Sequence, residues 1–117
     1  MEVPVTLRPG TLVTIAFPFT DLSAVKRRPA LVLISAGADF VLCGVTSQLS
    51  RRIDAVRLEQ NDMMEGRIPR VSEIRPLKLF TIHQSLVHHV VGRVKKGTLA
   101  SVVHVISASL EAGVVRA

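Results

Sequence analysis

The sequence predicts a small β-rich domain of the α+β class that ends in a single helix. Short apolar runs alternate with turn-forming glycines, prolines and aspartates, a pattern typical of a barrel or a sandwich. The spacing of apolar residues becomes helical only near the C-terminus. The chain has 117 residues, which is the length of one domain, so we expect a single domain over residues 1–117.

Three apolar runs in the first half of the chain predict strands. Residues 11–17 and 40–46 alternate between two faces, whereas residues 30–34 are continuously apolar, as in a central strand. A short strand around residues 55–58 and a longer one from residue 72 toward residue 82 are also expected, with an irregular segment at 60–69 between them. Thr46 therefore ends a strand, as a polar residue where the apolar run stops.

The C-terminal segment predicts an amphipathic helix. Apolar residues recur at helical spacing at Leu99, Val102, Val103, Ile106 and Leu110. Thr98 is available as the N-cap, and Gly113 stands where such a helix would end. The apolar face of this helix should pack against the sheet.

The single cysteine and the N-terminal residues favour a cytoplasmic protein. Cys43 lies in an apolar run, where we expect it to be buried, and it has no partner for an intramolecular disulfide. Prolines, Arg8 and Gly10 interrupt the first ten residues, so a signal peptide is not expected. No apolar stretch is expected to reach the roughly 18 residues of a membrane span.

The chain is basic, with a net charge of +6, and eleven of its fifteen Lys and Arg residues are arginine. Polyanions are therefore the first class of partner to consider. The planar guanidinium group suits phosphate oxygens, which points to nucleic acid. On charge alone, the solubility of a small protein would explain the same balance equally well.

Five fragments carry the functional interpretation: residues 17–23 (FPFTDLS), 26–33 (KRRPALVL), 45–48 (VTSQ), 72–75 (SEIR) and 78–82 (KLFTI). In this order and at these separations they resemble the MazF/PemK-like toxins of type II toxin–antitoxin systems. The resemblance extends over residues 10–110. It implies a small SH3-like barrel with a C-terminal helix, a homodimer and a cognate antitoxin as partner.

The same resemblance implies a metal-independent endoribonuclease that cleaves single-stranded RNA at selected sequences and thereby inhibits translation and growth. Such cleavage uses the ribose 2′-hydroxyl as nucleophile and leaves a 2′,3′-cyclic phosphate. It requires cationic donors at the phosphate and groups that accept and donate protons. No cofactor is expected, and one cysteine without a carboxylate cluster at ligand spacing argues against a metal site.

Arg28, Thr46 and Ser72 are the catalytic candidates. Arg28 precedes Pro29, which favours an extended backbone at the start of a core strand, and its guanidinium can clamp a phosphate. Thr46 can donate its hydroxyl to a phosphate oxygen, although threonine is also a common strand residue. Ser72 stands where one branch of the family has an aspartate. A serine is a poor general base, and Glu73 would lie on the opposite face of a regular strand, so the proton acceptor stays open.

The expected RNA contacts are Phe19, Lys26, Arg27, Ser47, Gln48, Arg70 and Arg75. The polar loop at residues 18–27 should cover the RNA groove, and Phe19 is the phenylalanine expected near RNA. None of the four histidines matches a catalytic position of the family. His88 and His89 are adjacent and are expected to point in opposite directions on a strand.

Two other functions remain open. A non-catalytic nucleic-acid-binding barrel, conceivable because of the serine at position 72, predicts binding without cleavage. A CcdB-like gyrase-poisoning toxin would share the architecture. The resemblance to that group implies a toxin that acts by binding a protein and whose activity depends on a tryptophan in its C-terminal tail. This chain ends in Val115, Arg116 and Ala117 and has no tryptophan. For the toxin, the antitoxin is expected to insert an acidic, partly disordered segment into the basic groove.

Overall fold

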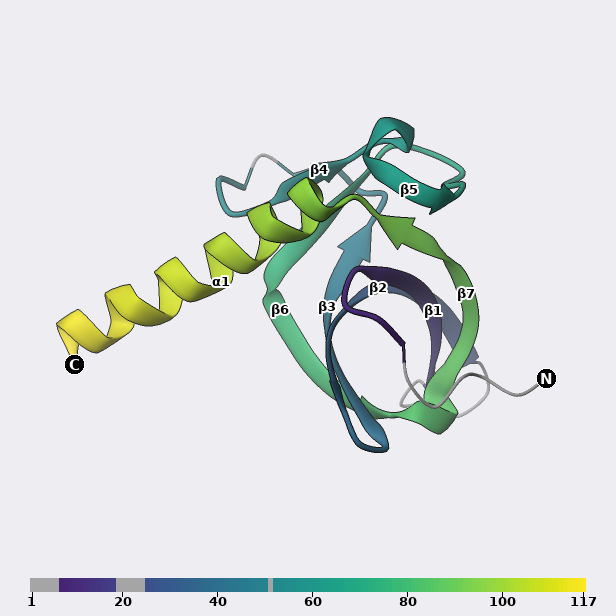
Figure 1. Cartoon of the computed structure of the whole chain (residues 1–117), viewed down its shortest axis with the longest axis horizontal. Helices are drawn as coiled ribbons and strands as arrows, with labels where there is room; N and C mark the ends of the chain where they lie inside the picture. The colour runs from purple at the N-terminus through teal and green to yellow at the C-terminus, as the bar shows by residue number, and fades with distance from the viewer. Residues whose placement is uncertain (1–6, 19–24, 51) are drawn as a thin grey trace.

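The computed structural model describes residues 7–18, 25–50 and 52–117. Within these residues, seven strands pair antiparallel in one sheet with the order β4-β6-β3-β2-β1-β7-β5. The sheet curls round on itself, and the C-terminal helix leaves one end of it (Figure 1). The expected β-rich fold with one long helix is confirmed.

The elements, in chain order, are β1 (Thr11–Pro18), β2 (Val25–Ala36), β3 (Asp39–Thr46), β4 (Val56–Leu58), the 3-10 turn η1 (Gln60–Asp62), β5 (Met63–Gly66), β6 (Ser72–His83), the 3-10 turn η2 (Gln84–Leu86), β7 (Val87–Val94) and α1 (Lys96–Arg116). All five strands expected from the sequence are present. The segment at 60–69 is not wholly irregular, since it contains η1 and β5. The apolar pattern of the sequence did not predict β7.

Both ends of α1 differ from the sequence prediction. The helix begins at Lys96 because Lys95, with φ -67 and ψ 154, is extended, so Thr98 lies within the first turn and is not the N-cap. Gly113 does not end the helix, which continues to Arg116. The described glycines with positive φ are Gly10, Gly37 and Gly66, so Gly113 lacks the left-handed conformation that stops a helix.

The core lies on both faces of the curled sheet, because successive side chains of a strand point to opposite sides. One cluster contains Ala30, Val32 and Leu42 from the central strands. The other contains Leu31 and Cys43 with Val102, the buried residue of α1. Burial raises the pKa of the Cys43 thiol to about 12, so this cysteine is a small core residue and stays protonated at neutral pH.

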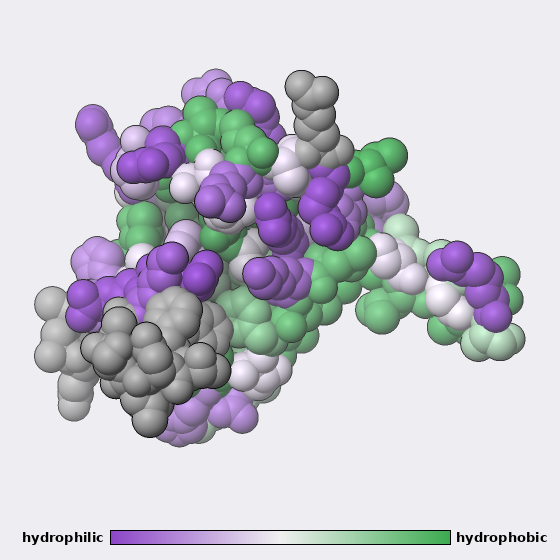
Figure 2. All heavy atoms as spheres, turned by 180° about the vertical axis from the view of Figure 1, so that it is seen from behind, coloured by the Kyte–Doolittle hydropathy of each residue, from purple (hydrophilic) through white to green (hydrophobic). Residues whose placement is uncertain are grey.

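By length and composition alone, α1 is long and apolar enough to cross a membrane, which the sequence prediction did not anticipate. Polar residues nevertheless interrupt it at Ser101, His104, Ser107, Ser109 and Glu111. Its first turns contact β4 and β6, and its outer part projects away from the body of the protein (Figures 1 and 2). The helix therefore begins as the amphipathic cover of a folded core.

Candidate functional site

The start of β2 and the end of β3 bring Arg28 and Thr46 together. Ala30 pairs with Gly44 in the antiparallel register, and Arg28 and Thr46 each lie two residues beyond that pair. Because side chains alternate along a strand, both project from the same face as Ala30 and Gly44. Arg28 and Thr46 both line the same two cavities.

The first cavity has a volume of about 650 Å³ and gathers most of the predicted site. The predicted residues on its wall are Lys26, Arg27, Arg28, Thr46, Ser47, Gln48, Arg70 and Ser72. Four of these carry a positive charge, and the described residues of the wall include no carboxylate. On the face that Figure 2 shows, hydrophilic side chains are interspersed with hydrophobic ones. A wall with four cations and no described carboxylate is suited to a polyanion.

The second cavity has a volume of about 410 Å³ and shares Arg28, Thr46 and Gln48 with the first. Arg75 lines this second cavity and is absent from the wall of the first. Lys78, which was not among the predicted site residues, also lines this cavity. The only signal for Lys78 in the sequence was its place at the start of the fragment at 78–82.

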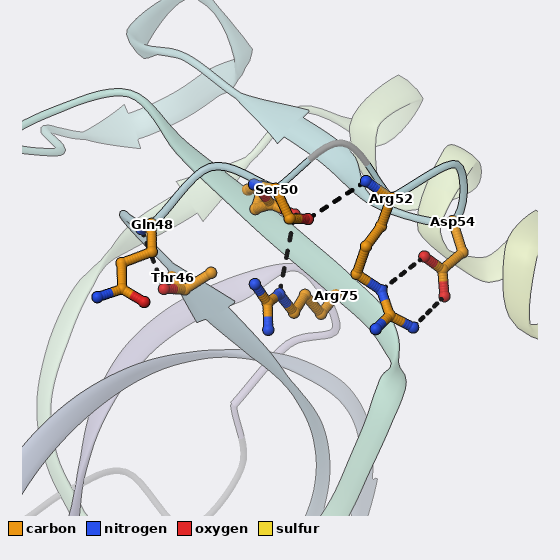
Figure 3. Close-up of polar contacts among 7 residues, drawn as sticks. Thr46, Gln48, Ser50, Arg52, Asp54 and Arg75 are labelled. Atoms are coloured by element: carbon orange, nitrogen blue, oxygen red, sulfur yellow. Dashed lines mark hydrogen bonds and ion pairs between the residues drawn. The ribbon is translucent and has the colours of Figure 1, made fainter.

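The hydroxyl of Thr46 is held by its own turn. Its oxygen accepts a hydrogen bond of 3.1 Å from the backbone N–H of Gln48 (Figure 3). Since a hydroxyl both donates and accepts, its proton is left to donate to an anion in the cavity. The half-buried Thr46 side chain thus has a defined orientation.

Ser72 is buried, with 8% of its surface exposed, and its hydroxyl donates to the backbone carbonyl of Arg70 at 3.1 Å. The described residues that line the first cavity include no histidine or carboxylate that could activate it. Ser72 is therefore placed to hold the backbone at Arg70, which itself points to the cavity.

Glu73 and Arg75 lie together on the other side of β6, as the period-two geometry predicted. The Glu73 carboxylate accepts from the backbone N–H of Ser50 and from its hydroxyl at 2.8 Å, and the Arg75 Nε lies 3.8 Å from Oε2. The Ser50 amide first, then its hydroxyl and the charge of Arg75, hold the pKa of Glu73 below its ordinary value. A carboxylate so stabilised is a poor proton acceptor.

The loop after β3 is closed by polar contacts that the sequence did not reveal. The hydroxyl of Ser50 also accepts from the backbone N–H of Arg52 at 3.3 Å. The Arg52 side chain contacts both carboxylate oxygens of Asp54 at 3.0 and 3.1 Å (Figure 3). This arrangement fixes Ser50 where it can hold Glu73.

The prediction that His88 and His89 point in opposite directions is wrong. The register between β1 and β7 shifts between Thr14 and Ile15, so His88 is an extra residue in a bulge. The two rings lie side by side with centroids 6.4 Å apart, and His88 Nδ1 is 3.4 Å from the Thr14 hydroxyl. Neither ring lines the described walls of the two cavities.

Phe19 and most of the loop predicted to cover the groove lie outside the described residues. Among the residues that the structure describes, no three His, Cys, Asp or Glu side chains come close enough to hold a metal ion.

Known proteins match this chain in a family model and among solved structures. No curated protein sequence matches this chain significantly. Among solved structures, a MazE–MazF crystal structure from Deinococcus radiodurans is 20% identical with a TM-score of 0.75, over 93% of this chain and 98% of that one. An endoribonuclease in complex with its cognate antitoxin, from a mycobacterial species, is 16% identical with a TM-score of 0.65, over 95% and 96%. These likenesses show the fold.

The family comparison is more specific than the structural one. The model of the PemK-like, MazF-like toxins of type II toxin–antitoxin systems matches residues 8–110. That range contains every described residue of both cavity walls. The chain belongs to this PemK-like, MazF-like toxin family.

Proposed function

We propose that this protein is a metal-independent endoribonuclease and the toxin of a type II toxin–antitoxin pair. It cleaves single-stranded mRNA at selected sequences in the cytoplasm and so inhibits translation and growth. One observation carries the proposal: Arg28 and Thr46 both line two cavities whose described walls hold six cationic side chains and no carboxylate. Family membership supports it, as do the mycobacterial neighbours named as endoribonucleases.

The reaction is a transesterification at phosphorus. The ribose 2′-oxygen attacks the adjacent phosphorus, the bond to the 5′-oxygen of the next nucleotide breaks, and a 2′,3′-cyclic phosphate and a 5′-hydroxyl remain. Negative charge grows on the phosphate oxygens in the transition state, where a guanidinium stabilises it. Arg28 supplies that charge, and Thr46, its oxygen held by the Gln48 amide, donates a hydrogen bond to the same oxygens.

The remaining residues of the first cavity bind and orient the RNA. Lys26, Arg27 and Arg70 contact phosphates of the nucleotides that flank the cleaved bond. Ser47 and Gln48 supply further polar contacts. We assign Ser72 to positioning the backbone at Arg70, since its hydroxyl is already bonded there. DNA is not cut because it lacks the 2′-hydroxyl.

The test is an incubation of purified protein with mixed-sequence single-stranded RNA in excess EDTA, followed by analysis of the product ends. Fragments with cyclic phosphate ends are expected. Arg28→Ala should lower kcat/KM by about 10² to 10³, the usual effect of removing one donor to a developing oxyanion. Arg116→Ala removes an equal charge from the exposed end of α1 and should cleave like the wild type, as should His89→Ala.

Three outcomes separate the alternatives. RNA that stays intact although the protein binds it would assign the chain to the non-catalytic binding modules. Cleavage by Arg28→Ala at the wild-type rate would show that the catalytic site is not at Arg28. Cleavage lost on chelation and restored by a divalent cation would contradict the metal-independent chemistry.

The proposed partners are a second copy of the chain and an antitoxin. An acidic antitoxin segment would enter the same cation-lined cavities and compete with RNA. The affinity of toxin for antitoxin should then weaken as salt is added, because exposed charges are screened. An affinity that is indifferent to salt would contradict this mode of binding.

A further inference from the structure

Strand β6 contains a wide irregularity beside the site. Gly44 of β3 pairs with Arg75, whereas its neighbour Cys43 pairs with Leu79. Three residues of β6 between these partners, Pro76, Leu77 and Lys78, therefore form a bulge without register partners on β3. A proline has no amide hydrogen for a regular ladder, and the buried Pro76 is accommodated because the ladder is interrupted there.

The bulge directs Lys78 across β3. A methyl group at Gly44 would lie 3.2 Å from Cδ and 3.5 Å from Cγ of Lys78, so the aliphatic stem crosses β3 where a side chain is missing. Gly44 and Thr46 project from one face, which brings Lys78 to the same side as Arg28 and Thr46. No carboxylate in the described part of the chain forms an ion pair with Lys78.

The second cavity combines charge with an apolar wall. Its cations are Arg28, Arg75 and Lys78, and its apolar side chains include Ile15, Leu79 and the half-buried Phe80. A single-stranded nucleic acid is bound by this combination, since the base packs on an aromatic or apolar surface while cations contact the backbone. The volume of about 410 Å³ lies within the range of small-ligand pockets.

We propose that the second cavity is a binding subsite for one RNA nucleotide adjacent to the cleaved phosphate. Lys78 and Arg75 contact its backbone phosphate, and Phe80 and Leu79 pack against its base. The proposal rests on the proposed nuclease function, because Arg28 and Thr46 would hold the cleaved phosphate between the two cavities. The first cavity then takes the nucleotide on the other side of that phosphate.

The experiment measures binding of a 2′-O-methyl oligonucleotide that carries the protein's cleavage sequence, by fluorescence anisotropy at several salt concentrations. Lys78→Ala is expected to weaken binding roughly fivefold, the size of one partly exposed charge contact. The slope of log K against log salt should fall by about 0.7, as for one lost phosphate contact on a single strand. Lys96→Ala, a charge-matched change at the exposed start of α1, should leave both unchanged.

A second variant tests the path of the side chain. Gly44→Ala places a methyl group against the Lys78 stem and should weaken binding in the same direction, with the lysine still present. Shortening the oligonucleotide by one nucleotide, on one side of the cut or the other, identifies the occupant. One of the two truncations should make the wild type and Lys78→Ala bind equally.

The outcomes separate this subsite from the nuclease function. If Lys78→Ala binds with the wild-type affinity and salt slope, the subsite is overturned, whether or not the protein cuts RNA. If the binding differences appear but the wild-type protein does not cut RNA with free 2′-hydroxyl groups, the subsite stands and the nuclease proposal fails. Without cleavage there is no cleavage sequence, so binding is then measured with a mixed-sequence 2′-O-methyl oligonucleotide.

Discussion

Arg28 owes its placement to the residue that follows it. Pro29 restricts Arg28 to an extended backbone and lies opposite Thr14 of β1, while Arg28 lies opposite Ile15. The Arg28 side chain therefore extends from a backbone position that is paired with β1. Thr46 gains a comparable restraint from the Gln48 amide. The extended backbone at Arg28 and the strand end at Thr46 follow from local sequence, whereas the assignment of both residues to the site came from the family resemblance.

Glu73 should make the stability of the protein depend on pH. Its pKa in the folded protein is lowered, chiefly by the Ser50 amide. A group of this kind stabilises the folded state above its unfolded pKa, about 4.5 here, and the stabilisation is lost as the pH falls through the lower, folded value. Glu73→Gln should therefore lower the free energy of unfolding more at pH 7 than at pH 3.

Urea denaturation at the two pH values measures this difference. Glu111→Gln is the matched control, because Glu111 is exposed on α1 and forms no ion pair with a described residue. It should change the free energy of unfolding little at either pH. A loss of stability in Glu73→Gln that is equal at pH 7 and pH 3 would show that the carboxylate charge is not what Ser50 and Arg75 stabilise.

At the scale of elements, two glycines allow β5 to approach β7. Gly66, with φ 82, pairs with Gly92, and a methyl group on Gly92 would lie 2.2 Å from the carbonyl oxygen of Glu65. Gly92→Ala should therefore separate the two strands and destabilise the protein by about 2 kcal/mol or more, as backbone clashes in a packed region do. Thermal or urea unfolding measures the change.

Gly97→Ala is the control for that change. Gly97 lies in the first turn of α1, and a methyl group there would meet nothing within 4 Å. Alanine is the better helix former, so the variant should be more stable than the wild type by about 0.5 to 1 kcal/mol. If Gly92→Ala were as stable as Gly97→Ala, the close approach of β5 to β7 would not be required by the fold.

The elements differ in how far their sequences reveal them. Alternating or continuous apolar runs predicted β1, β2, β3 and β6, because each of these strands buries a regular set of side chains. Strand β7 (VHHVVGRV) has no such period, since a bulge at His88 and glycine at 92 break the alternation. The predicted ends of α1 were wrong because the helix begins after Lys95, which provides no side-chain cap, and because Gly113 stays helical.

The same limit applies to the site. Seven of the eight predicted residues on the wall of the first cavity belong to fragments that resemble the family, and Arg70 lies just before the fragment at 72–75. Ser50 and Lys78 were not predicted, since their roles depend on a loop closed by Arg52 and Asp54 and on a bulge in β6. Register shifts and loop contacts arise from tertiary packing, which no local pattern encodes.

At the scale of the whole molecule, α1 leaves an apolar stripe uncovered. Leu99, Val102 and Ile106 pack against the barrel, and the same side of the helix continues through Leu110 and Val114, which are 66% and 75% exposed. The outer half of the helix projects away from the sheet (Figure 1). An isolated helix end is marginally stable in water, and most helical stability comes from packing of an apolar face.

The proposed homodimer accounts for this stripe. Val103, Leu110 and Val114 follow one another at spacings of seven and four and are 48%, 66% and 75% exposed, so this side of the helix is left for a second helix to pack against. A second copy that covers the stripe would bury the exposed leucine and valines. Leu110→Glu should then convert the dimer to a monomer, because it places a charge within an apolar contact. Analytical ultracentrifugation across a concentration series measures the change.

The control is Ala108→Glu, which introduces the same charge on the opposite side of the same helix, where the side chain is exposed. It should leave the dimer intact. Circular dichroism distinguishes dissociation from unfolding, since the barrel strands keep their own core in the Leu110→Glu monomer. If both variants remain dimeric, the two copies meet elsewhere; if the wild type is monomeric at all concentrations, the stripe is not covered by a second copy. Loss of RNA cleavage together with dimerisation in Leu110→Glu alone would show that the site needs residues from both copies.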